Sequence, residues 1–227
     1  MTKTKSTRLI VLSLVAGALL APAIVTPAVA ATSSDEAGLR QWLSTYGVSE
    51  ATQDTLVAKA EQGQLFDAGQ SGKSPVSAAT VAGAEVETFA DGSVLVTQLE
   101  APKVLPKGVV QTQAAIQGCT LVNGGGYATY SNCTIVQSNG TMEIAFTGSY
   151  QRYTGGAKIT KASNPRTNVK YGSTTTPTVK INRATSTGST EAYATAYAKF
   201  TSHNGLSSED MYLALRVTSA KAWATDY

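Results

Sequence analysis

Polar and apolar residues alternate through most of the second half of the chain. Met142, Ile144 and Phe146 fall on one face of such an alternation. A period of two residues predicts β-strands with one buried face. We expect strands near residues 116–122, 128–137, 141–152, 157–162, 167–172, 178–185, 191–202 and 210–220. Turn signals rich in Gly, Asn, Ser and Pro separate these segments at intervals of roughly 8–12 residues, which predicts a sandwich or barrel.

Two of these strands carry long apolar rows. One row is Ala192, Ala194, Ala196, Ala198 and Phe200, and the other is Met211, Leu213, Leu215 and Val217. Small alanine side chains let a neighbouring sheet approach closely, so we expect the first row to pack in the core. A groove lined by these alanines is the alternative.

Residues 33–63 follow a helical period instead. Ser33 and Glu36 fit a capping box, and Ser49 fits the cap of a second helix. Gly47 and Gly63 are the expected ends of the two helices. The expected apolar stripes are Leu39, Trp42, Leu43 and Tyr46 in the first helix and Leu56, Val57 and Ala60 in the second. Two short helices need a partner for these stripes, and we expect the β-domain rather than another protein to supply it.

The stretch between the helices and the strands divides into three parts. Residues 67–83 are small and polar and predict a loop or linker. Residues 85–100 predict a β-hairpin that turns at Asp91-Gly92. The two prolines in 101–108 interrupt regular structure, so we place a domain boundary near residue 108.

The two cysteines, Cys119 and Cys133, flank a triple glycine at 124–126. Paired across a hairpin, they require a turn centred on residue 126, such as a three-residue loop at 125–127 or a five-residue loop around it. Their spacing is not the C-x-x-C of redox catalysts. We therefore predict a structural disulfide that lies over apolar side chains and fixes the register of this hairpin.

The first 30 residues have the pattern of an export signal. Lys3, Lys5 and Arg8 precede an apolar run, and Ala28 to Ala30 form a small-residue cleavage site. Ser13, Gly17 and Pro22 interrupt the run, which favours cleavage after Ala30 over a retained membrane anchor. The sequence therefore predicts a secreted protein with no transmembrane segment after removal of the signal, a compartment in which the two cysteines pair.

These patterns predict an α+β protein that is predominantly β. After the signal peptide (1–30), we expect an N-terminal region of a small helical hairpin and a β-hairpin (31–108). The third part (109–227) is a C-terminal antiparallel β-sandwich of about eight strands with a disulfide-stapled hairpin.

Net charge argues against a nucleic-acid partner. The leader holds three of the 18 basic residues and none of the 15 acidic ones, so the mature chain has 15 of each. Residues 31–110 carry 10 acidic and 5 basic side chains, and residues 111–227 carry the reverse. This asymmetry suggests that the halves dock on each other or differ in role, and an acidic pro-segment at 31–108 is one such role.

We identify no catalytic, cofactor or metal motif in the sequence. The single histidine, His203, adjoins the Asn204-Gly205 turn signal, and no serine lies in a G-x-S-x-G elbow. A glycosidase would need two carboxylates, and those of the β-domain have no distinctive surroundings: Glu143, Glu191, Glu209, Asp210 and Asp226. We therefore expect a non-enzymatic protein without cofactor or metal.

Tyrosines and cations are the remaining candidates. Nine of the ten tyrosines lie from Tyr127 onward, and seven basic residues but no acidic one lie between Glu143 and Glu191. Tyrosine faces can stack on sugars, and cations attract anionic polymers, although tyrosine is also simply a common strand residue. The candidate ligand-binding residues are Tyr150, Arg152, Tyr153, Lys158 and Tyr171.

The leading functional hypothesis is a secreted binding protein for cell-envelope polymers or polysaccharide, with a Tyr-rich and basic β surface as the contact. The alternative is a secreted toxin or bacteriocin-like protein whose amphipathic strand at 191–202 acts on membranes.

Overall fold

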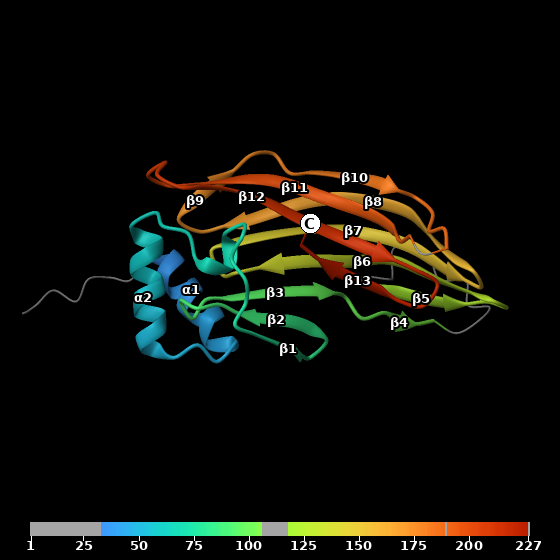
Figure 1. Cartoon of the computed structure of the whole chain (residues 1–227), viewed down its shortest axis with the longest axis horizontal. Helices are drawn as coiled ribbons and strands as arrows, with labels where there is room; N and C mark the ends of the chain where they lie inside the picture. The colour runs from blue at the N-terminus through green and yellow to red at the C-terminus, as the bar shows by residue number, and fades with distance from the viewer. Residues whose placement is uncertain (1–32, 106–117, 189, 227) are drawn as a thin grey trace, which may run out of the picture. The chain divides into compact units, whose positions relative to one another are not determined.

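A computed structural model describes residues 33–105, 118–188 and 190–226 (Figure 1). The predicted signal peptide at 1–30 and the predicted boundary near residue 108 lie outside these residues. The described residues all belong to one compact unit, Thr32–Tyr227. Two helices precede the strands, and the strands form two sheets. No helix in the described part of the chain is long and apolar enough to cross a membrane.

The predicted helical hairpin is confirmed. Helix α1 spans Ser34–Thr45 and helix α2 spans Glu50–Glu61. The Ser33 hydroxyl accepts the amide of Glu36 at 3.1 Å, as in a capping box, while the Glu36 carboxylate accepts Nε of Arg40 at 2.8 Å. Leu39 and Leu43 are fully buried, so the helix stripe is satisfied within the molecule.

The first sheet has eight strands. They are β1 (Ser77–Val81), β2 (Ala84–Thr88), β3 (Val94–Leu99), β4 (Lys103–Val104), β5 (Thr120–Asn123), β6 (Tyr127–Ser138), β7 (Met142–Tyr153) and β8 (Gly156–Val169). Strand β6 pairs with β7, and it also pairs with β5 near its start and with β3 near its end. Strands from both sides of residue 108 therefore share this sheet. All of its pairs are antiparallel except β4 with β5.

The second sheet has five strands. They are β9 (Gly172–Thr174), β10 (Thr178–Arg183), β11 (Ala192–Ser202), β12 (Ser208–Val217) and β13 (Ala222–Thr225). Strands β10, β11, β12 and β13 are neighbours in that order, and β9 also pairs with β11. Just after the end of β10, the Ala184 carbonyl accepts the amide of Ile159 of β8 at 2.8 Å.

The two sheets enclose a common core, as a sandwich requires. Ile144 and Phe146 of β7 are buried with Leu213 and Leu215 of β12. The alanines of the predicted row are fully buried in the same core. The alanine row therefore packs in the core. Each fully buried leucine of this core contributes about 2 kcal/mol to the free energy of folding.

Two sequence predictions were wrong within the strands. Ser163-Asn164-Pro165 was expected to be a turn between two strands, but β8 runs through it as one strand. The register between β7 and β8 shifts there, and Asn164 has φ 54°, so the segment is a bulge that accommodates the proline. Residues 67–83 are not simply a loop: they hold a 3-10 turn, η1 (Asp67–Gly69), and strand β1.

The Cys119–Cys133 disulfide is confirmed, with its Cα atoms 3.9 Å apart and both cysteines fully buried. The predicted loop was wrong. The Gly124 amide donates to the Tyr127 carbonyl at 2.8 Å, which leaves a two-residue turn at 125–126. This register places Thr120 opposite Ser131. The extra residue is Asn132, whose φ of 56° forms a bulge that brings Cys133 to Cys119.

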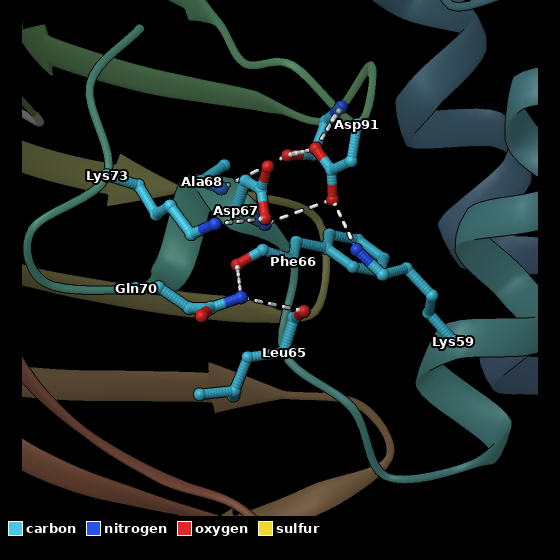
Figure 2. A network of polar contacts seen from close by, with 9 residues as sticks. Lys59, Leu65, Phe66, Asp67, Ala68, Gln70, Lys73 and Asp91 are labelled. Atoms are coloured by element: carbon cyan, nitrogen blue, oxygen red, sulfur yellow. Dashed lines mark hydrogen bonds and ion pairs between the residues drawn. The ribbon is translucent and has the colours of Figure 1, made fainter.

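Asp91 links the helices to the sheet (Figure 2). Its carboxylate accepts Nζ of Lys59 from α2 at 2.8 Å, the amide of Asp67 from η1 at 3.0 Å and the amide of Ser93 at 3.0 Å. Burial alone would raise the pKa of Asp91, but these bonds and that of the Ser93 hydroxyl outweigh it and lower the pKa to about 2. The predicted Asp91-Gly92 turn thus also anchors the helical hairpin.

Candidate binding site

The outer face of the five-stranded sheet gathers four aromatic side chains. Because Ala194 and Ala196 of β11 point into the core, the residues that alternate with them point outward. Pairing then brings outward residues of β12 and β13 beside them. We call this surface the aromatic face, defined by Tyr193, Tyr197, Tyr212 and Trp223.

The first row of the aromatic face alternates cations and rings. Tyr193 pairs with Arg216, and Arg216 pairs with Trp223. The guanidinium carbons of Arg183 and Arg216 each lie 5.5 Å from the centroid of the Tyr193 ring. Nζ of Lys221 lies 4.6 Å from the centroid of Trp223. These distances fit cation–π attraction, which fixes the orientation of the rings.

Ionic contacts hold the arginines of this row in place. Nη1 of Arg216 forms an ion pair with a carboxylate oxygen of Glu191. Nη1 of Arg183 donates to the Glu191 carbonyl at 3.1 Å. A backbone hydrogen bond and the contact with Arg216 lower the pKa of the Glu191 carboxyl. The row is therefore positioned by charge as well as by packing.

The second row contains two tyrosines. The rings of Tyr197 and Tyr212 lie 5.0 Å apart between centroids, inclined by 39°. The Tyr197 hydroxyl donates to Asp210 at 2.9 Å, and this bond raises the pKa of Tyr197. Nζ of Lys199 lies 4.0 Å from the same carboxylate oxygen of Asp210. Tyr193 and Tyr197 are four positions apart along β11, so the two rows are about 13 Å apart.

Small residues lie between the two rows. Thr195 pairs with Ala214, and Ala214 pairs with Thr225. Thr195 is 6% exposed and Ala214 is fully buried although both point outward, because the larger side chains of the neighbouring rows shield them. Within the described ranges the Thr195 hydroxyl is buried without a hydrogen-bond partner. The aromatic face thus offers flat rings at two levels, with charged and hydroxyl groups around them.

The structure places Tyr150 and Arg152 elsewhere. Tyr150 of β7 is 2% exposed and stacks on Tyr130 at 4.5 Å; burial raises the pKa of Tyr150. The Arg152 guanidinium donates to the Ser219 carbonyl at 3.1 and 3.2 Å and to the Ala220 carbonyl. Both residues line a groove of about 520 Å³ that residues of β2, β3, β6 and β13 also line, with Trp223 of the aromatic face among them. In this state Arg152 ties β7 to the turn before β13.

The structure does not bring the other three predicted binding residues to that groove. Tyr153 and Lys158 share the outer face of the eight-stranded sheet, where Tyr153 is 36% exposed. Tyr171 packs beside the helices, in the cluster that contains Leu39 and Leu43. The five sequence-predicted residues therefore occupy three separate places.

Sequence reasoning missed the residues of the aromatic face as a group. The alternation that predicted the alanine row also implied that Tyr193 and Tyr197 share the opposite face of β11. That signal was available in the sequence. To place Tyr212 and Trp223 on the same face, one must know how β11 is aligned with β12 and β12 with β13. The sequence does not specify this alignment.

Of the five carboxylates weighed for glycosidase chemistry, two lie apart and three lie around one cleft. Glu191 pairs with Arg216, and Glu143 lies on the outer face of β7. Glu209, Asp210 and Asp226 line a cleft of about 420 Å³ that also includes Glu87. Burial, with a smaller effect of Asp226, raises the pKa of Glu87. Across the described ranges no three His, Cys, Asp or Glu residues are placed to hold a metal ion.

Comparison with known proteins gives no functional guide. No known protein family matches the sequence, and no curated protein matches it. Among solved structures, the hypothetical protein lmo2686 from Listeria monocytogenes EGD-e shares 16% identity over 63% of this chain and 92% of that chain, with a TM-score of 0.35. A likeness at that TM-score carries no argument about fold or function.

Proposed function

We propose that the chain is a secreted, non-enzymatic binding protein that contacts a cell-envelope polysaccharide through the aromatic face. The observation that carries the proposal is the gathering of Tyr193, Tyr197, Tyr212 and Trp223 on one side of one sheet. The leader pattern and the Cys119–Cys133 disulfide support an extracellular location.

The chemistry of the aromatic face suits a sugar polymer. Pyranose rings have an apolar C–H face and a rim of hydroxyls, so they stack on aromatic rings and hydrogen-bond at the edge. Tyrosine and tryptophan combine apolar area with a polar group, and Arg183, Arg216 and Asp210 lie beside the rings. Two rows of rings about 13 Å apart would engage separate residues of one extended chain.

Preorganisation supports the same proposal. The rings are already oriented by cations and by each other, so little rotational freedom remains to be lost on binding. The inner side of this sheet packs in the core of the sandwich, which supports the rings from behind. An open sheet surface suits a repetitive polymer better than a small ligand that must be enclosed.

Sedimentation with insoluble glycans and isolated cell walls tests the proposal. The protein is mixed with each particle, pelleted, and the amount left in solution is measured. We expect retention on at least one carbohydrate, and a Tyr197→Ala, Tyr212→Ala double variant to weaken it roughly tenfold. The matched control is Tyr127→Ala with Tyr153→Ala, which removes two exposed tyrosines from the other sheet.

Two results contradict the proposal. One is the absence of retention on every glycan and cell wall at micromolar protein. The other is equal weakening by the double variant and its control, which would mean that any exposed tyrosine serves and that the aromatic face is not the site.

A further inference from the structure

Three cations lie in line on the outer face of β8. In antiparallel strands, directly opposite residues share a face. Lys158 is opposite Gln151, Lys161 is opposite Ser149, and Arg166 is opposite Ala145. Because Ile144 and Phe146 point into the core, Ala145 and the residues in phase with it point outward. We call Lys158, Lys161 and Arg166 the cationic strip.

The acidic half of the chain does not neutralise this strip. Those of its carboxylates that form ion pairs do so with cations of their own half: Glu36 and Asp54 with Arg40, Asp67 with Lys73, and Asp91 with Lys59. The two other ion pairs of the described residues lie on the five-stranded sheet. The sequence-based expectation that the two halves dock by charge therefore does not account for the strip.

Side chains around the strip are hydroxylated or amide-bearing. On β7 the outward residues beside it include Thr147, Ser149 and Gln151, and Nε2 of Gln151 donates to Thr129 of β6 at 3.3 Å. Glu143 is the acidic residue of this face; it lies near its far end, opposite Asn168. Tyr153 lies at the other end, one outward position beyond Gln151.

The geometry selects an extended partner. From Lys158 to Arg166 the strand covers at most about 26 Å, since each residue advances about 3.3 Å and two bulges shorten the path. Three charges spread over that length match widely spaced anions on a linear chain. Hydroxyls and amides between them suit a polyol or sugar backbone.

We propose that the cationic strip binds a linear anionic carbohydrate polymer, whose charges are phosphodiesters or carboxylates, laid along β8. This surface is on the sheet opposite the aromatic face, so the inference stands apart from the proposed function and either can fail alone.

The test measures binding of the full mature chain to defined polymers at several salt concentrations. The probes are a lipid-free polyglycerol phosphate for phosphodiesters, alginate for carboxylates and dextran as the neutral polymer. We expect affinity for at least one anionic probe that falls as salt rises, and none for dextran at this surface. Because each neutralised phosphate contributes a slope of roughly 0.7 for a single strand, K158Q/K161Q/R166Q should lower the slope of log affinity against log salt by about 2.

A matched variant separates the strip from net charge. R40Q/K73Q/K103Q removes the same charge from residues outside both the strip and the aromatic face and should keep the parental slope. The proposal is overturned if neither anionic probe binds, if both triple variants change the slope equally, or if binding does not depend on salt. Stronger strip-dependent binding to anionic lipid vesicles or duplex DNA than to both polymers would also overturn it, because the partner would be of another class.

Discussion

The guanidinium of Arg216 lies 5.5 Å from the centre of the Tyr193 ring and is held there by an ion pair with Glu191. The contact joins two strands across one row of the aromatic face. The orientation of the Tyr193 ring therefore depends on the charged group of Arg216. A substitution at Arg216 should alter glycan binding without removing an aromatic ring.

Replacing Arg216 by lysine should weaken glycan binding several-fold. Lysine keeps the charge but loses the planar group that stacks on Tyr193 and pairs with Glu191, and a cation–π contact at such a site is worth about 0.5–1 kcal/mol. The measurement is the Kd for the best-retained glycan, with Arg40→Lys in α1 as the control. An unchanged Kd in Arg216→Lys would show that ring orientation does not matter.

Asp91→Asn should lower the free energy of unfolding at neutral pH by about 1–2 kcal/mol, after allowance for solvent screening. The folded state lowers the pKa of Asp91 from 3.8 to about 2. Its contribution is therefore complete above pH 3.8 and is lost as the pH falls toward 2. Urea unfolding at pH 7 and pH 2.5 measures the difference, which should shrink at the lower pH. Asp54→Asn, at an exposed carboxylate, is the control, and an equal loss at both pH values would contradict the assignment.

Removing the disulfide should destabilise the fold without being specific to binding. A bridge across 14 residues contributes roughly 3 kcal/mol in the chain-entropy model. Cys119→Ser with Cys133→Ser should lower the free energy of unfolding by about that amount, as urea denaturation would measure. Glycan retention of the folded fraction should be unchanged. A stable variant that lost binding would instead place the cysteines in the site.

Export should yield a chain that begins at Ala31 and keeps the helices. Strand β3 pairs with β6, and Asp91 ties α2 to the sheet. A chain that begins at residue 109 lacks these partners and should fail to unfold cooperatively. N-terminal sequencing of the secreted protein and thermal unfolding of the shortened chain check both points. A secreted chain starting near residue 110, folded and stable, would support the pro-segment interpretation.

Local signals in the sequence were sufficient to predict those features that depend on interactions between residues close together in the chain. Ser33 and Ser49 begin the two helices as their hydroxyls predict, and the alternation of alanines identified the buried side of β11. Two cysteines in the chain left one pairing to predict. The sequence failed where a residue departs from the regular register. Asn164 adopts a positive φ and forms a bulge where a turn was expected, and Asn132 forms a bulge that lets the cysteines meet beside a turn shorter than expected.

The candidate site depended on the same missing information. Trp223 reaches Tyr193 through Arg216, across three strands. Such neighbours are set by the pairing of whole strands, which no short stretch of sequence specifies. Tyr150 and Arg152 stood out by composition, yet one is buried and the other bonds to the turn before β13.

Fluorescence of Trp223 tests the central claim most directly. The chain has two tryptophans, Trp42 beside Tyr46 in α1 and Trp223 on the aromatic face. In a Trp42→Phe variant the emission reports Trp223 alone. Titration with a soluble fragment of the retained glycan should shift this emission to shorter wavelength and saturate at the Kd found by sedimentation. Saturable binding with no change in Trp223 emission would contradict binding at the aromatic face.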